Sequence, residues 1–502
     1  MTEPIKALQE YLATIDDISQ AASLLSWDQL TYMPPKGAEA RANQLTTLSR
    51  LSHEYSTSKQ LGQLIDAAET ALTPDDNISA ALVRVARRNY DRNCKLPTEL
   101  VAELTHTAVL GNEVWEQARA ATDFKLFAPQ LEHTFELQRQ VAEHLGYQEH
   151  PYDALLDQYE PGMTTRQVQS LFEELQAGLV PLVAAIAPRH QATDDQPLHQ
   201  PFDPDQQLAW GWKIVTGWGF DPEAGRQDQT VHPFCTSFSP HDVRITTRVY
   251  PDFLSPALFG TMHETGHALY EQGINPAFSR GPLGAPASLG VHESQSRLWE
   301  NLVGRSPTFW SKHYEDLQAT FPQLKSTSFD RFVKAVNTVQ PSTIRVEADE
   351  LTYNLHILLR FEMETALLTG NLAVKDVPEA WNARMQSLLG ITPPDDSEGV
   401  LQDVHWSGGS VGYFPTYTIG NVLSVQLWEA AQRDDPAMGT ELARAKYGKL
   451  LHWLREHVHQ YGAMELPNDL IQRATGEPLT AKPYLNYLKT KFTALYGLPL
   501  TD

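Results

Sequence analysis

Apolar residues recur every three or four positions along most of this chain. The N-terminal segment places Ile5, Leu8, Leu12, Ile15 and Ile18 at that spacing, which puts them on one side of an amphipathic helix. The same spacing returns in "VQSLFEELQAGLVPLVAAI" and in "LARAKYGKLLHWLREHVHQYG". Helices should therefore dominate, and we predict a mainly α fold.

One stretch departs from this helical pattern. Residues 231–253 alternate β-branched and aromatic residues around the turn-like "SPHD", which is typical of paired strands. We predict a small β-hairpin or sheet there. Because an isolated hairpin is only marginally stable in water, it must pack against helices.

The length of the chain alone would allow two or three domains. It has 502 residues, 41% of them apolar, enough for a large core. The sequence shows no Gly/Ser-rich or Pro-rich linker, no low-complexity block and no internal repeat. We therefore expect residues 1–502 to form a single domain.

The formal net charge is −23 and the pI is about 5.2. Nucleic acid and anionic lipid attract clustered Lys and Arg, so we expect neither partner. The two cysteines, Cys94 and Cys235, cannot build a disulfide framework. The start "MTEPIKALQEYLATIDD" lacks the features of a signal peptide, and no stretch approaches 18 uninterrupted apolar residues. We expect a cytoplasmic protein.

The segment "LFGTMHETGHALYEQG" carries the strongest chemical signal. Ser255 can cap a helix here, Pro256 suits its first turn and Gly273 can end it, so we predict a helix over about 256–273. His263 and His267 then lie one turn apart on one face. Two imidazoles in this arrangement bind zinc from one side, and Glu264 lies where it can take a proton from water at the metal.

A catalytic zinc site needs a third protein ligand. No third histidine follows at the short metzincin spacing, but "ASLGVHESQSRLWENLVG" downstream reads as a second helix over about 289–303. We choose Glu293 as the third ligand. Two alternatives in the same segment are His292 as a partner that supports a ligand and Glu300 as an ordinary surface carboxylate.

A further histidine pair, His457 and His459 in "HVH", also resembles a chelating pair. Side chains two positions apart on a helix face different directions. We therefore expect this pair to face solvent rather than to bind a metal.

Taken together, six motifs in order give the chain a family resemblance. They are "HPF" (232–234), "DVRIT" (242–246), "HETGH" (263–267), "HESQ" (292–295), "IRVEAD" (344–349) and "GVLQDVHW" (399–406). The chain resembles the carboxypeptidase Taq family of zinc metallocarboxypeptidases along nearly its whole length.

This resemblance implies a single helical domain with a deep substrate groove, similar to neurolysin and angiotensin-converting enzyme, and a small sheet beside the metal. It also implies a homodimer that releases single residues from peptide C-termini, with broad specificity and slowly at proline. Glu293 matches the family's third ligand in "HESQ". We expect one zinc ion per chain, although cobalt suits the same ligands.

The same residues suggest a mechanism. We expect Glu264 to deprotonate water at the metal and then to pass the proton to the leaving amine. The oxyanion needs another donor, and His405, Tyr413 and Tyr417 in "DVHWSGGSVGYFPTYTIG" are candidates because Gly-rich backbone permits close approach. The alternative is that these aromatic residues are core and the glycines form turns.

Two arginines lie within the motifs and could bind the C-terminal carboxylate of a peptide substrate. Arginine pairs with a carboxylate through two charge-assisted hydrogen bonds. Arg244 shares a strand face with Asp242 and could pair with it, so we expect it to shape the closed end of the groove. We expect Arg345, at the start of a probable helix, to bind the substrate's terminal carboxylate. Its alternative is an ion pair with an acidic neighbour (Glu347, Asp349 or Glu350).

Two rival functions remain open on the sequence. A zinc endopeptidase would use the same metal helix and would differ in not requiring a free chain end. A non-catalytic metal-binding or peptide-binding scaffold would not need Glu264, which is present.

Overall fold

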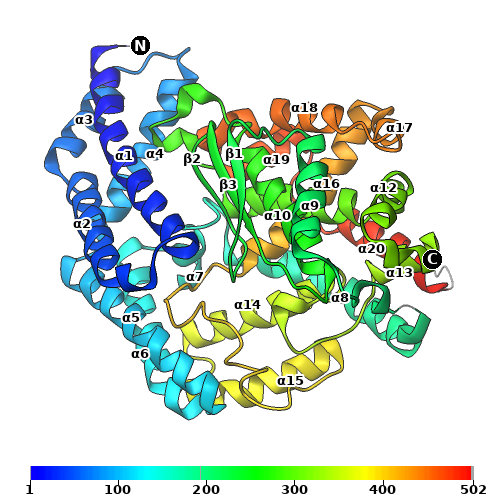
Figure 1. Cartoon of the computed structure of the whole chain (residues 1–502). Helices are drawn as coiled ribbons and strands as arrows, with labels where there is room; N and C mark the ends of the chain where they lie inside the picture. The colour runs from blue at the N-terminus through cyan, green and yellow to red at the C-terminus, as the bar shows by residue number, and fades with distance from the viewer. Residues whose placement is uncertain (1, 193, 499–502) are drawn as a thin grey trace. The chain divides into compact units, whose positions relative to one another are not determined.

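The computed structural model describes residues 2–192 and 194–498 (Figure 1). It is 70% helical and contains one small three-stranded sheet. The prediction of a mainly α fold with a small sheet is confirmed.

The chain divides into two compact units, each built from three separate stretches. Unit 1 comprises Met1–Cys94, Gln196–Phe329 and Leu427–Pro478, and unit 2 comprises Lys95–Asp195, Asp330–Gln426 and Leu479–Asp502. The prediction of one domain over residues 1–502 stays a prediction.

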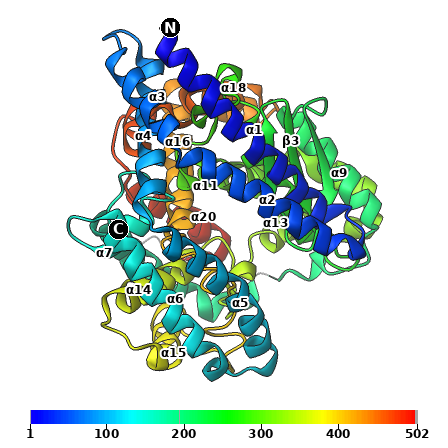
Figure 2. The same cartoon turned by 90° about the vertical axis from the view of Figure 1, so that its left-hand side faces the viewer.

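Unit 1 begins with a pair of long helices, α1 (Glu3–Thr31) and α2 (Ala38–Ser56), which lie side by side (Figure 2). The predicted apolar stripe of α1 is buried at Ile5, Leu8 and Leu12 and half-buried further along. Further helices that belong mainly to this unit, besides the two that are described with the sheet below, are α3 (Lys59–Thr70), α4 (Asn77–Lys95), α9 (Pro204–Trp218), α12 (Pro307–Thr320), α17 (Met438–Leu442), α18 (Gly448–His457) and α19 (Pro467–Thr475).

Unit 2 is helical throughout its regular structure. Its helices are α5 (Thr98–Ala121), α6 (Phe124–Leu145), α7 (Pro151–Leu156), α8 (Thr165–Ile186), α14 (Tyr353–Thr369), α15 (Val377–Leu389) and α20 (Lys482–Tyr496). Two helices, α13 (Phe329–Ala335) and α16 (Pro415–Asp434), carry the chain across the boundary between the units. One segment, Thr165–Arg189, is long and apolar enough to cross a membrane by length and composition, a weak sign because buried core helices pass the same test.

The sheet of unit 1 has the order β1-β3-β2. Strands β2 (Cys235–Ser239) and β3 (Asp242–Thr247) pair antiparallel and confirm the predicted hairpin. Strand β1 (Gly225–Gln229) pairs parallel with β3. The sequence gives no sign of β1, because "GRQDQ" lacks apolar alternation. Both β2 and β3 contact helix α10 (Leu254–Glu271), as Figure 1 shows, so the sheet supports that helix.

Helices α10 and α11 (Leu289–Arg297) correspond to the two helices predicted for the metal site. Ser288 caps α11 by accepting a hydrogen bond from the backbone N–H of Val291, and the chain continues as a π-helical turn over Leu298–Gly304. The predicted cap at Ser255 is wrong, because α10 already begins at Leu254 and Phe253 occupies the cap position.

The contact between α10 and α11 depends on Gly266, the glycine of "HETGH". A Cβ atom built at this position would lie 2.4 Å from Cα of Ser296 and 2.5 Å from the carbonyl oxygen of Gln295. Both are backbone atoms, which no change of rotamer can move away. The two helices therefore approach as closely as they do because residue 266 has no side chain.

We predict that Gly266→Ala lowers the free energy of unfolding by about 1–3 kcal/mol, since overpacking forces the two backbones apart. Gly260→Ala is the matched control, because it lies on the same helix and its Cβ would meet the Thr247 hydroxyl at an ordinary 3.4 Å. That control should be neutral or stabilising by up to about 1 kcal/mol through helix propensity. Denaturant unfolding of both variants checks this, and equal stabilities would contradict the close-approach argument.

Candidate metal centre

His263 and His267 lie on one face of α10, as their spacing predicts. Their ring centroids are 5.0 Å apart. Residues of α11 face the same side, because Glu293 Oε2 lies 3.6 Å from His263 Nε2 and 3.3 Å from His267 Nε2. The structure thus brings together the three residues chosen from the sequence.

These three side chains have the donor set and the spacing of a divalent-metal site. Two imidazole nitrogens and one carboxylate oxygen converge with all three atoms within 4.8 Å of one another. Tetrahedral ligands held about 2.0–2.1 Å from zinc are about 3.3–3.4 Å apart. The separations of 3.3 and 3.6 Å between Glu293 Oε2 and the two imidazole nitrogens fit this requirement.

Two of the three groups are held in the protonation state that a ligand needs. Burial, together with the neighbouring His292, lowers the pKa of His267 to about 3, so its imidazole is neutral. Burial alone would raise the pKa of Glu293, but Arg297 and the two histidines outweigh it and keep the carboxylate ionised. At His263 burial lowers the pKa, yet the negative charge of Glu293 and the bond to Glu300 raise it overall.

The prediction that Glu300 is a surface carboxylate is wrong. We expected an ordinary surface carboxylate, but only 7% of the residue is exposed, and its Oε2 lies 2.9 Å from His263 Nδ1. The other alternative, His292, lies against a ligand: its ring stacks on His267 at 4.4 Å, and its Nε2 lies 2.8 Å from Glu271 Oε1.

Glu264 follows the first histidine and is also buried, with 7% of the residue exposed. Burial raises its pKa to about 7, with the charge of Glu293 adding to the rise and that of His263 opposing it. A carboxyl with a pKa near neutrality can both accept and return a proton at physiological pH. The group therefore has the property required of a general base beside the metal ligands.

The prediction that the "HVH" pair faces solvent is wrong for His459. This residue is fully buried, its Nε2 lies 2.9 Å from Gln295 Oε1 on α11, and its ring packs against Tyr270. The helix ends at His457, so helical geometry no longer directs the side chain at position 459. His459 supports the helix that carries Glu293.

Arg244 in unit 1 pairs with Asp242, as the strand spacing suggested. Its Nε and Nη2 donate to the two carboxylate oxygens at 2.8 and 2.9 Å. The guanidinium also lies 4.3 Å from the ring centre of Trp27 and 4.9 Å from that of Phe238. These contacts attach the N-terminal helix α1 to the sheet.

Arg345 lies in unit 2 and is 5% exposed. Its Nε and Nη2 donate to Asp403 Oδ1 at 3.0 and 2.8 Å, and its Nη1 donates to the Tyr353 hydroxyl. The three acidic neighbours that the sequence offered are therefore not its partners. It also begins only a short 3₁₀ turn, Arg345–Glu347, instead of the predicted helix.

Asp403 serves a second buried arginine. Arg360 on α14 donates through Nε to Asp403 Oδ2 at 2.6 Å, so one carboxylate lies between two guanidinium groups. Burial raises the pKa of Asp403, but the two arginines outweigh it and lower it overall. The ionised carboxylate balances only one of the two positive charges.

The other substrate candidates of unit 2 gather around this pair. His405 Nε2 lies 3.4 Å from the Tyr417 hydroxyl, and the rings of His405 and Tyr413 are 5.5 Å apart. The Arg345 guanidinium lies 5.2 Å from the Tyr417 ring centre. Burial lowers the pKa of His405 to about 4, so its imidazole is neutral. Four of the five predicted substrate residues thus form one cluster within unit 2.

One expectation about the glycine-rich segment is corrected by the structure. A Cβ at Gly412, whose φ is +93°, would lie 2.9–3.0 Å from backbone atoms of Leu155 and Leu156. The close approach at this glycine is therefore to the protein's own chain. Gly412 therefore forms a turn, which was the alternative interpretation of these glycines.

The sequence pattern described as "Carboxypeptidase Taq (M32) metallopeptidase" matches residues 7–492. The chain belongs to the carboxypeptidase Taq family.

Curated relatives cover almost the whole chain. Thermostable carboxypeptidase 1 of Thermus thermophilus is 43% identical over 492 residues, 96% of each chain. Carboxypeptidase 1 of Bacillus subtilis is 40% identical over 98% of this chain and 99% of its own. The crystal structure of the M32 carboxypeptidase from Deinococcus radiodurans R1 is 44% identical, covers 99% and 100% of the two chains and superposes with a TM-score of 0.95.

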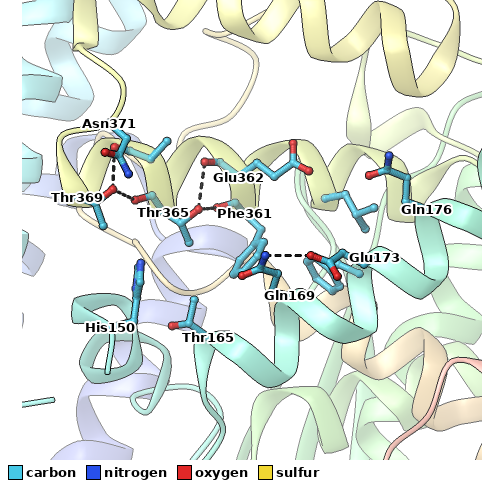
Figure 3. Close-up of a pocket in the computed structure, with 13 residues that line it drawn as sticks. His150, Thr165, Gln169, Glu173, Gln176, Phe361, Glu362, Thr365, Thr369 and Asn371 are labelled. Atoms are coloured by element: carbon cyan, nitrogen blue, oxygen red, sulfur yellow. Dashed lines mark hydrogen bonds between the residues drawn. The ribbon is translucent and has the colours of Figure 1, made fainter. Parts of the chain in front are cut away.

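A cavity in unit 2 is lined by none of the site residues predicted for this carboxypeptidase Taq chain. It has a volume of about 330 Å³ and lies between α8 and α14, with Phe172 and Phe361 among its walls (Figure 3). Two of its acidic side chains already have partners, since Glu173 accepts a hydrogen bond from Gln169 and Glu362 pairs with Arg384. We assign it no part in the chemistry.

Sequence reasoning missed four charged residues that support the site residues. Glu300 and Arg297 border the metal ligands, and Asp403 and Arg360 hold Arg345. For two of these residues the sequence contained a feature that could have identified them. Glu300 lies seven positions after Glu293, on the same helix face, and Asp403 is part of "GVLQDVHW". Nothing in the sequence pattern singles out Arg360.

Proposed function

We propose that this metal-dependent carboxypeptidase is a zinc enzyme that releases single residues from the C-termini of peptides. The observation that carries the proposal is the convergence of His263, His267 and Glu293 beside the buried Glu264. By analogy with the family, its specificity is broad and its activity slow at proline.

The chemistry divides between the ion and the side chains. An ion held by these three ligands would polarise the scissile carbonyl and make a water molecule more acidic. Glu264 accepts the proton of the attacking water and later donates it to the leaving amine. Its pKa of about 7 supports both halves of this cycle.

Recognition of the chain end is assigned to unit 2. Arg345 and Arg360 share the single carboxylate of Asp403, so the three groups together carry an excess positive charge. A buried excess charge is costly unless it is paired, and a substrate carboxylate would supply the missing negative charge. We therefore keep Arg345 as the group that binds the substrate carboxylate.

The remaining substrate roles follow from donor chemistry. Neutral His405 and the hydroxyls of Tyr413 and Tyr417 can donate to the developing oxyanion. Arg244, stacked on Trp27 and paired with Asp242, is assigned to shaping the closed end of the groove. We further propose that the enzyme is a cytoplasmic homodimer with one zinc ion per chain, for which cobalt could substitute.

Replacing Glu264 with Gln tests the assigned base. The amide keeps the size of the side chain but cannot hold the proton, so kcat should fall by about 10²–10⁴-fold while bound metal stays at the wild-type level. Glu315→Gln, an exposed glutamate on α12, is the control and should leave both unchanged. Turnover near that of the wild type with full metal content would exclude Glu264 as the base.

Replacing Arg345 with Ala tests whether this arginine binds the terminal carboxylate of the substrate. Losing a desolvated charge pair should cost roughly 2–4 kcal/mol in kcat/KM on a peptide with a free C-terminus. Residual cleavage of the same peptide with an amidated C-terminus should change far less. Mass spectrometry of the products measures both, and in the wild type stepwise loss of single residues should come almost entirely from the free form.

Comparing the free and the amidated peptide with the same variant controls for structural damage caused by the substitution. A purely structural arginine would lower cleavage of both peptides equally, which would contradict the assignment. Cleavage of the amidated peptide by the wild type at internal bonds would instead indicate an endopeptidase.

A further inference from the structure

Glu300 occupies an unusual turn that follows helix α11. The chain widens from α-helical to π-helical geometry over Leu298–Gly304, and the backbone N–H of Arg305 bonds to the carbonyl oxygen of Glu300 at 3.0 Å. Such π-helical turns are rare and are frequent at functional sites. The turn places a buried carboxylate beside the first histidine of α10.

The carboxylate contacts the ring nitrogen of His263 that points away from the ligand trio. Nδ1 lies 2.9 Å from Glu300 Oε2, whereas Nε2 faces Glu293 Oε2. A carboxylate only accepts hydrogen bonds, so Nδ1 must carry a hydrogen, and in the neutral imidazole Nε2 then presents its lone pair. Glu300 therefore selects the tautomer that can bind a metal.

Two arginines hold Glu300 in place. Arg305 donates to Oε1 at 2.8 Å, and Arg297 lies 3.4 Å from Oε2. Arg297 also donates through Nε to Glu293 Oε1 at 2.7 Å, which leaves Oε2 of that ligand facing the histidines. One arginine thus links the ligand carboxylate to the carboxylate behind His263.

We infer that Glu300 is a positioning residue for the metal: it fixes the ring and the tautomer of His263, and Arg297 and Arg305 hold it in turn. The inference rests on the proposed metal site. A carboxylate behind a ligating imidazole makes that ligand a stronger base, and losing such a partner typically costs about 10–100-fold in metal affinity.

The test measures zinc affinity by competition with a chelator, independently of catalysis. In Glu300→Gln the dissociation constant for zinc should rise about 10–100-fold relative to the wild type, because the amide lacks the charge. The visible spectrum of the cobalt-loaded variant should change as well, since the position of His263 at the ion changes. If Glu300→Gln does not fold, Glu300→Asp keeps the charge opposite both arginines but withdraws it from His263, and it should weaken zinc binding in the same way.

Glu350→Gln is the matched control. The Glu350 carboxylate also pairs with a cationic side chain away from solvent, that of Lys491, and it accepts a hydrogen bond from Tyr487; neither partner touches the ligand trio in the contacts described above. Its substitution should change zinc affinity by less than about 3-fold, well below the effect of losing a partner of a ligand. An equal loss in this control, or an unchanged affinity in the Glu300 variant that folds, would overturn the inference. Failure of the wild type to bind zinc would instead contradict the proposed function.

Discussion

The metal centre depends on the close approach of two helices. Helix α10 supplies two histidines on one face, but the third donor comes from α11, and its distance from the histidines is set where the backbones meet at Gly266. A side chain there would overlap Ser296 and separate Glu293 from its partners. The sheet on one side of α10 and His459 behind α11 support the same contact. One missing Cβ therefore determines whether three donor atoms can share one ion.

Arginines and carboxylates pair in the buried part of both units. In unit 1, the two positive charges of Arg297 and Arg305 offset the two negative charges of Glu293 and Glu300. In unit 2, two arginines share the single carboxylate of Asp403, so one positive charge is left over. Because unpaired charge is costly in a buried site, the imbalance in unit 2 indicates an anionic ligand.

The elements with strong periodicity could be predicted from the sequence, and those whose position depends on tertiary contacts could not. The hairpin, both metal-site helices and the shared face of His263 and His267 follow from spacing. Glu293 was chosen because a catalytic metal needs a third ligand and the second helix offered one. Strand β1 was missed because its polar residues pair only after β3 is in place. Glu300 and His459 were misjudged as exposed, since their burial depends on a π-helical turn and on a helix end that periodicity does not reveal. The alternative considered for Arg345, an ion pair with an acidic residue nearby in sequence, was wrong, because its partner Asp403 lies 58 positions away.

We infer that His263, His267 and Glu293 hold one catalytic ion. Anomalous diffraction at the zinc edge, from crystals of the zinc-loaded enzyme, tests it most directly. We predict a single strong peak within about 2.0–2.2 Å of Nε2 of His263, Nε2 of His267 and Oε2 of Glu293. A fully active enzyme with no peak at this position, or with its zinc bound by other residues, would contradict the account.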